Sequence, residues 1–192
     1  MSIDDGQDRP MENSYWIRPG RFAAGEYPGH WDRAWAAEKV RKLLDAGIDH
    51  FIDLTEQGEL EPYSGIIAGE ARRRGLEIGW ERHPIVDLNV PSSPQRMVKI
   101  LDAVDAALGD GRTVYVHCWG GVGRTGTTVG CWLVRHGRTG GEALRRIAEW
   151  WRGMEKNDYH PISPETREQR EYVRSWSEPS TASVTGRPGE TQ

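Results

Sequence analysis

The apolar positions of the chain fall into short runs typical of strands and longer stripes typical of helices. Runs rich in β-branched and aromatic residues predict strands at 48–54, 76–82 and 113–117. Helical spacing predicts helices at 31–46, 65–74, 94–108, 124–136 and 140–151. A last helix is expected from Ser163 to Trp176, with Pro164 at its first helical position. Strands and helices therefore follow one another along most of the chain.

The most informative stretch joins the predicted strand at 113–117 to the predicted helix at 124–136. It places Cys118 and Arg124 six positions apart, with three glycines between them and the hydroxyl residue Thr125 directly after. A glycine-rich turn at a helix N-terminus points several backbone N–H groups at one spot, which also lies at the positive end of the helix dipole. The guanidinium of Arg124 adds a planar fork that holds two phosphate oxygens. The stretch therefore predicts a phosphate cradle.

A cysteine at the bottom of such a cradle indicates nucleophilic chemistry. An ordinary thiol, with a pKa of about 8.5, is only a few per cent thiolate at neutral pH, but a field that binds phosphate also stabilises a thiolate. We therefore expect Cys118 to attack phosphorus, Thr125 to donate its hydroxyl to the departing sulfur, and His117 to brace the loop rather than act as a base. The residues expected to bind phosphate are Trp119, Gly120, Gly121, Val122, Gly123 and Arg124.

A general acid for the leaving oxygen is expected upstream, in the loop bracketed by Pro84 and Pro91. Asp87 lies in this loop, where its carboxylate can reach over the phosphate cradle. The alternative is that Asp87 caps a turn or the helix near Ser93, but a serine serves that cap better. His83 is a weaker candidate for the acid and is expected to be structural.

The pattern Cys-x5-Arg-Thr-Gly after a strand, preceded by Pro-Ile-x-Asp-x-x-x-Pro, resembles the cysteine-dependent protein tyrosine phosphatases. The likeness is greatest to their small, atypical dual-specificity branch and spans roughly residues 15–176. It implies Cys118 as nucleophile, Arg124 as phosphate clamp, Asp87 as general acid and Thr125 as helper hydroxyl. It also implies a single-domain α/β fold, a central mostly parallel mixed sheet flanked by helices, which opens with a strand pair at 14–24. The family uses no metal and no cofactor.

The predicted substrate is a phosphomonoester on a protein tyrosine, serine or threonine. The five residues between Cys118 and Arg124 carry no charge, which argues against an inositol polyphosphate. A small-molecule or RNA 5′-end phosphatase on the same chemistry remains open. A sulfurtransferase or arsenate reductase leaves Asp87 without a role, and a reductase needs a resolving cysteine. A non-catalytic phosphate-binding module is a further alternative, but such modules typically lack the cysteine, the arginine or the acid.

Several side chains near the cradle have two interpretations. Trp119 forms either a pocket wall or packing beneath the loop. Thr55, Glu56 or Tyr63 reach the rim of the pocket if the carboxyl end of the strand at 48–54 lies beside it, although plain exposure is the simpler expectation. A glutamine in the larger phosphatases positions the hydrolytic water, and Gln169 is a weak match to it because its local setting differs.

Composition bounds the remaining possibilities. The 192 residues suit one domain at 14–176, between a flexible tail at 1–13 and a disordered tail at 177–192. A net charge of −4 gives no sign of a nucleic-acid partner. A mean hydropathy of −0.70 without long apolar runs predicts no membrane span, and no secretory signal is seen.

The chain has two cysteines, Cys118 and Cys131. With Cys118 reserved for chemistry, a disulfide framework is not expected, and a reducing cytoplasm fits. Cys131, two turns along the predicted helix, is expected to be buried packing rather than a resolving thiol. The oligomeric state is left open by the sequence.

Overall fold

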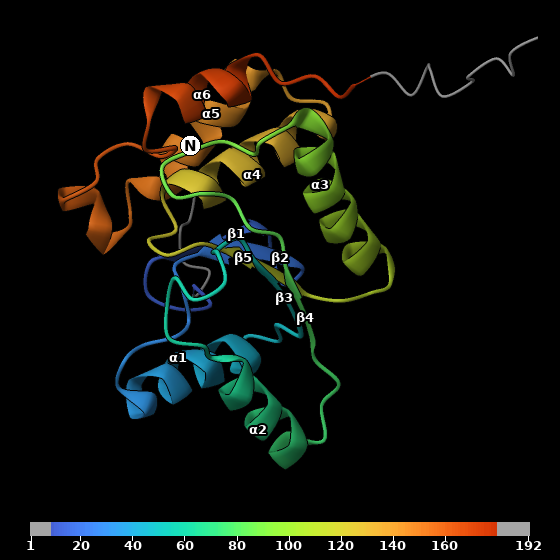
Figure 1. Ribbon diagram of the computed structural model, residues 1–192, viewed down its shortest axis with the longest axis vertical. Helices are drawn as coiled ribbons and strands as arrows, with labels where there is room; N and C mark the ends of the chain where they lie inside the picture. The colour runs from blue at the N-terminus through green and yellow to red at the C-terminus, as the bar shows by residue number, and fades with distance from the viewer. Residues whose placement is uncertain (1–8, 180–192) are drawn as a thin grey trace, which may run out of the picture.

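A five-stranded mixed sheet with helices on both faces forms the centre of the molecule (Figure 1). The structure, a computed structural model, describes residues 9–179. The sheet order is β1-β2-β5-β3-β4; β1 pairs antiparallel with β2, and the other pairings are parallel. The strands are β1 Ser14–Arg18, β2 Phe22–Gly25, β3 His50–Asp53, β4 Gly79–Arg82 and β5 Val114–His117. The predicted mostly parallel mixed sheet and its opening strand pair are confirmed.

Six α-helices and one 3-10 helix surround the sheet in the described part of the chain. They are α1 Arg33–Asp45, α2 Ser64–Arg74, α3 Pro94–Gly109, α4 Gly123–Arg135, α5 Gly140–Trp151, the 3-10 helix η1 Glu155–Asp158 and α6 Arg167–Arg174. In Figure 1, α1 and α2 lie below the sheet, whereas α3 to α6 lie above it. None of these helices combines the length and apolar character that crossing a bilayer requires.

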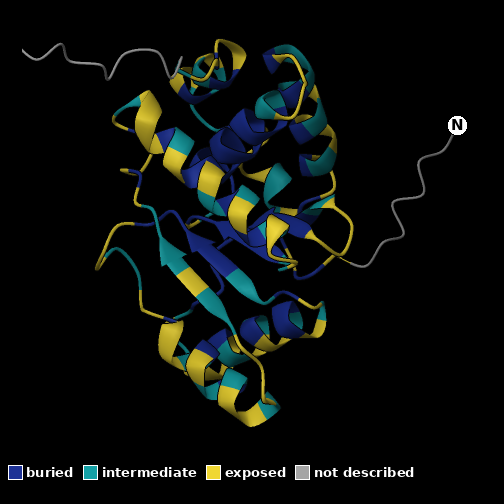
Figure 2. Ribbon diagram, turned by 90° about the vertical axis from the view of Figure 1, so that its right-hand side faces the viewer, coloured by how far each residue is buried: buried dark blue, intermediate teal, exposed yellow. Residues whose placement is uncertain are grey.

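The alternation of side chains along the strands divides the core between the two layers. Phe51 on β3 and Tyr115 on β5 pack with apolar residues of α1 and α2. Their neighbours Ile52 and Val116 point the other way, into the larger cluster formed with α3 to α6. All four side chains are fully buried. Figure 2 shows this central buried layer between helices with exposed outer faces. Strands buried on both faces hold the loops at their carboxyl ends in fixed places.

The two ends of the domain depart from the expected element boundaries. Of the tail expected at 1–13, residues 1–8 lie outside the described residues, but Met11 is buried. The last helix begins at Arg167 rather than Pro164, because Thr166 provides the cap by accepting a hydrogen bond from the Gln169 N–H at 3.1 Å. Ser163 instead donates its hydroxyl to the Val122 carbonyl at 2.8 Å. The expected tail at 177–192 is described as far as residue 179.

Candidate active site

The phosphate-binding loop, residues 118–126, joins the central strand β5 to helix α4. α4 is buried along most of its length, and its first turn has no side-chain cap on its N–H groups. These N–H groups are therefore left for a ligand at the helix N-terminus. Cys118 follows β5 directly and is 3% exposed. The sequence thus places the sulfur at the base of an anion site.

Glycine at position 121 meets two steric requirements of this loop. Its φ is +77°, and a Cβ there would come within 2.6 Å of the Gly25 backbone at the end of β2. Beside it, the Trp119 carbonyl accepts a hydrogen bond from the Tyr27 N–H at 2.9 Å. The loop therefore packs directly against the segment that follows β2.

Arg124 is the most heavily bonded side chain of the site. It is 1% exposed, and its Nη1 and Nη2 donate to the two carboxylate oxygens of Glu59 at 2.8 and 2.6 Å. Nη1 also donates to the Ile85 carbonyl at 3.1 Å, and Nη2 lies 2.9 Å from Asp87 Oδ1. Nε has no partner among the described residues. One edge of the guanidinium is thus fixed by the protein, while Nε is left for a ligand.

The charges around Arg124 reinforce one another. Burial alone lowers the pKa of Arg124, but the hydrogen bond to Glu59 and the adjacent acidic groups raise it above its ordinary value. Burial likewise acts to raise the pKa of Glu59, but the hydrogen bonds from Arg124 and the Glu56 backbone hold it below its ordinary value. Both groups therefore stay charged at neutral pH.

The acid loop, residues 84–91, follows β4 and carries Asp87. Its start is fixed by the Ile85 N–H, which donates to the Leu54 carbonyl at 3.0 Å. Beyond that point the loop is exposed, and Leu88 has a φ of +61°. The Asp87 side chain is 49% exposed and shares a cavity with Cys118. Ser93, rather than Asp87, caps α3, as expected. His83 pairs with Glu81 at 3.1 Å and does not line this cavity.

His117 lies beneath the loop in a buried chain of hydrogen bonds. Trp80 Nε1 donates to the Tyr63 hydroxyl at 3.1 Å, and that hydroxyl is bonded to His117 Nε2. The opposite ring nitrogen, Nδ1, faces the Cys118 carbonyl at 3.3 Å. Burial lowers the pKa of His117 to about 4, so the ring is neutral at pH 7. A neutral ring with Nδ1 protonated donates to the carbonyl and accepts from Tyr63, which satisfies every contact in the chain.

The cavity above the loop has a volume of about 420 Å³. Its lining brings together Cys118, Arg124 and Asp87, the three residues predicted to carry the chemistry. The full lining is Asp87, Leu88, Cys118, Trp119, Gly120, Val122, Gly123, Arg124, Lys156, Tyr159, His160 and Glu165. Trp119 is 58% exposed and forms part of the wall rather than packing beneath the loop. Gly121 and Thr125 lie behind this surface; Thr125 is fully buried, and its hydroxyl has no partner among the described residues.

Sequence reasoning missed two parts of the site. The segment 156–165, after α5, forms one wall of the cavity, although no motif in it indicates that role. Glu59 lies in the segment that was considered for the rim, but Thr55, Glu56 and Tyr63 were considered instead. Thr55 is buried and bonded to Asp53, Glu56 is exposed, and Tyr63 contacts His117. A carboxylate shortly after a parallel strand was the available signal for Glu59.

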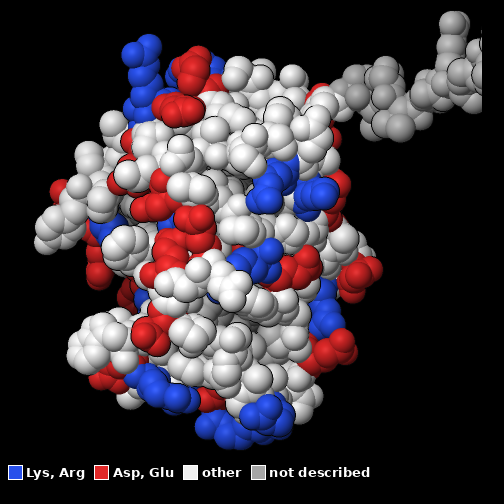
Figure 3. All heavy atoms as spheres, in the orientation of Figure 1, with Lys and Arg blue, Asp and Glu red and all other residues white. Residues whose placement is uncertain are grey.

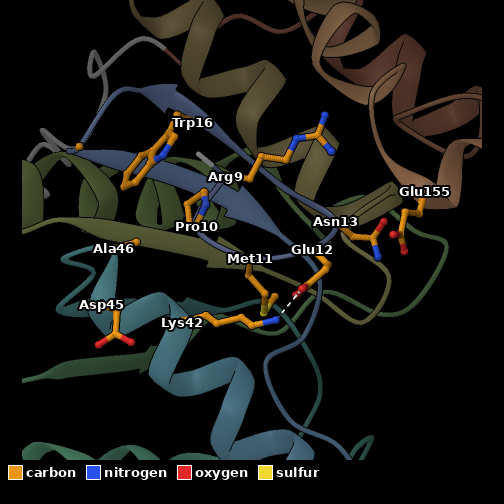
Figure 4. A pocket seen from close by; sticks show the side chains of 11 residues that line it. Arg9, Pro10, Met11, Glu12, Asn13, Trp16, Lys42, Asp45, Ala46 and Glu155 are labelled. Carbon is orange, nitrogen blue, oxygen red and sulfur yellow. Dashed lines mark hydrogen bonds and ion pairs between the residues drawn. The ribbon is translucent and has the colours of Figure 1, made fainter. Parts of the chain in front are cut away.

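A larger hollow of about 830 Å³ lies elsewhere, between segment 9–13, β1 and α1 (Figure 4). The described residues that line it include neither cysteine nor histidine, and its Lys42 pairs with Glu12 at 2.5 Å. Within residues 9–179, no group of three or more His, Cys, Asp and Glu side chains is arranged to hold a metal ion. The cavity at Cys118 is therefore the candidate active site.

Comparisons with known proteins bear directly on this geometry. Residues 27–138 match the family model described as Tc-R-P, polymorphic toxin system, DSP-PTPase phosphatase. The chain belongs to this family. The resemblance inferred from the Cys118–Arg124 motif is therefore confirmed. The matched range contains Glu59, Asp87 and the whole phosphate-binding loop.

Relatives of known name agree with the family. Over 112 residues the chain is 33% identical to the putative tyrosine phosphatase 067L of Invertebrate iridescent virus 3; the match covers 57% of this chain but 40% of the viral protein. The active form of Tk-PTP is 25% identical and covers 84% of this chain and 94% of its own, with a TM-score of 0.62. TpbA of P. aeruginosa, 18% identical with a TM-score of 0.63, covers 89% of each chain and shares the fold.

Proposed function

We propose that this domain hydrolyses phosphomonoesters in two steps through a cysteinyl-phosphate intermediate. The observation that carries the proposal is that one cavity holds Cys118, Arg124 and Asp87, with Asp87 2.9 Å from Arg124 Nη2. Nucleophile, phosphate clamp and acid are the three groups that this reaction requires. Membership of a phosphatase family supports the same reaction.

Substrate binding begins with a rearrangement at Arg124. Its Nε has no partner among the described residues, and its Nη2 is shared between Glu59 and Asp87. A phosphate held by Nε, Nη2 and the N–H groups of the loop displaces Asp87 from the guanidinium. Glu59 keeps its two hydrogen bonds and holds the fork in orientation. Asp87 then faces the bridging oxygen of the ester.

In the first step the Cys118 thiolate attacks phosphorus and the bond from phosphorus to the ester oxygen breaks. The proton of Asp87 passes to that oxygen, so the alcohol leaves neutral. Charge that develops on the phosphoryl oxygens is stabilised by Arg124 and the N–H groups of the loop. His117 acts from below, because its Nδ1 bond to the Cys118 carbonyl fixes the backbone that carries the sulfur.

In the second step Asp87, now a carboxylate, takes a proton from water as the water attacks phosphorus. The bond between sulfur and phosphorus breaks, and the thiolate leaves with inorganic phosphate as the product. The buried Thr125 hydroxyl, which is unpartnered among the described residues, is suited to donate to the departing sulfur. All the groups used in the cycle belong to the chain itself.

The cavity favours a simple monoester on a protein side chain. Its cationic side chains, Arg124 and Lys156, face the carboxylates of Asp87 and Glu165, and Lys156 also pairs with Glu26 at 2.7 Å. The lining therefore has no surplus positive charge for a second phosphate. Figure 3 shows carboxylates gathered across the middle left of its face, and lysines and arginines along the lower end. This distribution speaks against inositol polyphosphates and nucleic acid.

Aromatic side chains at the mouth favour an aryl ester. Trp119 and Tyr159 line the cavity and are 58% and 84% exposed, so their rings are available to pack on a phosphotyrosine ring. A small phosphomonoester with an apolar leaving group is the second candidate, since the same surface accepts it. The placement of the domain at residues 14–176 and a reducing compartment such as the cytoplasm, where Cys118 stays a thiol, belong to the same proposal.

The test is metal-free hydrolysis of p-nitrophenyl phosphate and of an alkyl phosphate by the wild type, Cys118→Ser and Asp87→Asn. We expect Cys118→Ser to abolish turnover. Asp87→Asn should slow it by roughly 10²–10⁴, most strongly for the alkyl ester, whose leaving group most needs the proton. Cys131→Ala, which changes a buried cysteine outside the cavity, is the matched control and should stay active. Unchanged turnover in Cys118→Ser would contradict the mechanism.

A further inference from the structure

Gln169 is a fully buried polar side chain that lies outside the cavity yet touches both of its loops. It occupies the first turn of α6, where its Oε1 accepts a hydrogen bond from the Thr166 N–H at 3.0 Å. Its Nε2 donates to the carbonyl of Asn89, in the acid loop, at 3.1 Å. Burial with both ends of the carboxamide bonded gives this side chain one defined position.

The contact with Asn89 leads directly to Asp87. Asn89 Nδ2 donates to the Asp87 carbonyl at 2.9 Å and closes the turn that carries the acid. Leu88, between them, has a φ of +61°, a conformation that an L residue keeps only when its neighbours hold it. The bond from Gln169 to Asn89 is one of the contacts that hold this turn from the side of α6.

The same carboxamide lies against the phosphate-binding loop. A Cβ at Gly123 would come within 2.8 Å of Gln169 Oε1 and 2.9 Å of its Nε2. Glycine at 123 therefore leaves the space in which the carboxamide sits. Through Gln169 the acid loop is placed relative to Gly123 itself, rather than only to the sheet.

A comparison with α5 shows why the residue is a glutamine. α5 has the same capping box, formed by Thr139 and Glu142, and there an acidic residue at the third position caps the helix. At α6 the corresponding side chain must accept from Thr166 on one side and donate to Asn89 on the other. Glutamate can accept but not donate, so only the amide serves both contacts.

We propose that Gln169 is a positioning residue that sets where Asp87 stands over the phosphate-binding loop. The proposal rests on the proposed function, because it assumes that Asp87 is the acid. Gln169 acts through the turn at Asn89 and touches neither the substrate nor the reacting atoms. It thus differs from a glutamine that orients the hydrolytic water.

The experiment uses Gln169→Glu, which keeps the size of the side chain and the bond from Thr166 but removes the donor to Asn89. We expect kcat for an alkyl phosphate to fall about tenfold and kcat for p-nitrophenyl phosphate to fall much less. Inhibition by inorganic phosphate should not change. In an Asp87→Asn background, Gln169→Glu should cause no further loss, since the two residues act in one unit.

Two further variants keep the test decisive if Gln169→Glu folds poorly. Asn89→Ala, at an exposed position, removes the bond to the Asp87 carbonyl and should give the same loss that depends on the leaving group. Thr166→Ala removes the cap of α6 but leaves the bond to Asn89, and should keep kcat within about twofold below its melting temperature.

The outcomes separate the two claims. If Asp87→Asn behaves as an acid variant but Gln169→Glu adds its full loss to it, slows both esters equally or weakens phosphate inhibition, the positioning role is overturned and the proposed function stands. Wild-type kinetics in Gln169→Glu and Asn89→Ala would also overturn it. If Asp87→Asn shows no dependence on the leaving group, the acid assignment itself fails, and the positioning role fails with it.

Discussion

The phosphate-binding loop and the acid loop face the same cavity but are held in different ways. In the former, Cys118 and Arg124 are 3% and 1% exposed, and the loop lies between a central strand and a buried helix. In the latter, Val86 and Leu88 are 55% and 51% exposed, and Leu88 has a left-handed backbone. One loop is built into the core, and the other rests over it on a few hydrogen bonds.

This difference separates two kinds of sensitivity. Changes around the phosphate-binding loop alter how phosphate is held, so they should affect all monoesters alike. Changes in the acid loop alter only the delivery of a proton, so their effect should grow as the leaving group becomes poorer. The dependence on leaving group therefore reports which loop a substitution has disturbed.

The largest expected effect is at Glu59, which fixes the phosphate clamp. Glu59→Gln replaces one of the two carboxylate oxygens on Arg124 with an N–H group that repels the guanidinium. We expect kcat/KM to fall by about 10², or about 2.7 kcal/mol, equally for alkyl and aryl phosphates. Steady-state kinetics on both substrates measure it. Glu56→Gln, on the same turn but exposed, is the control and should retain activity. A loss confined to the alkyl ester would place Glu59 with the acid loop instead.

The next effect concerns pH and the stability of the buried loop. The folded pKa of His117, about 4, lies below its ordinary value of 6.5, so the unfolded chain binds the proton first. The stability that depends on a neutral His117 is intact above pH 6.5 and is lost as the pH falls towards 4. Between pH 7 and pH 5 this amounts to about 2 kcal/mol.

Urea unfolding of the wild type and His117→Gln at both pH values tests this expectation. The glutamine does not titrate, so the wild type should lose about 2 kcal/mol more than the variant between pH 7 and pH 5. Parallel losses in the two proteins would mean that His117 does not distinguish this loop in acid.

The smallest effect tests the backbone of the acid loop. Asparagine tolerates a left-handed backbone better than leucine does, and Leu88 is half-exposed. Leu88→Asn should therefore raise the free energy of unfolding by up to about 1 kcal/mol. Val86→Asn, at a similarly exposed position without a positive φ, serves as the control in the same denaturation experiment. An equal change in both variants would remove strain at Leu88 from the comparison.

The sequence predicted best those features whose determinants are local. The strand, turn and helix around Cys118 lie within one short stretch, and the order of the sheet followed from the family that this stretch resembles. Asp87 could be found because two prolines bracket its loop. Glu59 could not, because only the tertiary fold carries it from the end of β3 to Arg124.

The wall at 156–165 and the start of α6 were missed for a related reason. Pro164 matches the first position of a helix, but Ser163 is drawn to the Val122 carbonyl, so the helix waits for the cap at Thr166. Contacts between distant segments decided both cases, and no local pattern records them. The roles of the site residues remain predictions for the kinetics above.

The wall of the cavity has a consequence for how the protein diversifies. The family model ends at residue 138, so it includes Cys118, Asp87 and Arg124 but not Lys156, Tyr159 or His160. Reaction and recognition are thus written in separate parts of the chain. Replacing the short segment between α5 and α6 would redirect the enzyme to a different phosphorylated surface while leaving its chemical machinery intact.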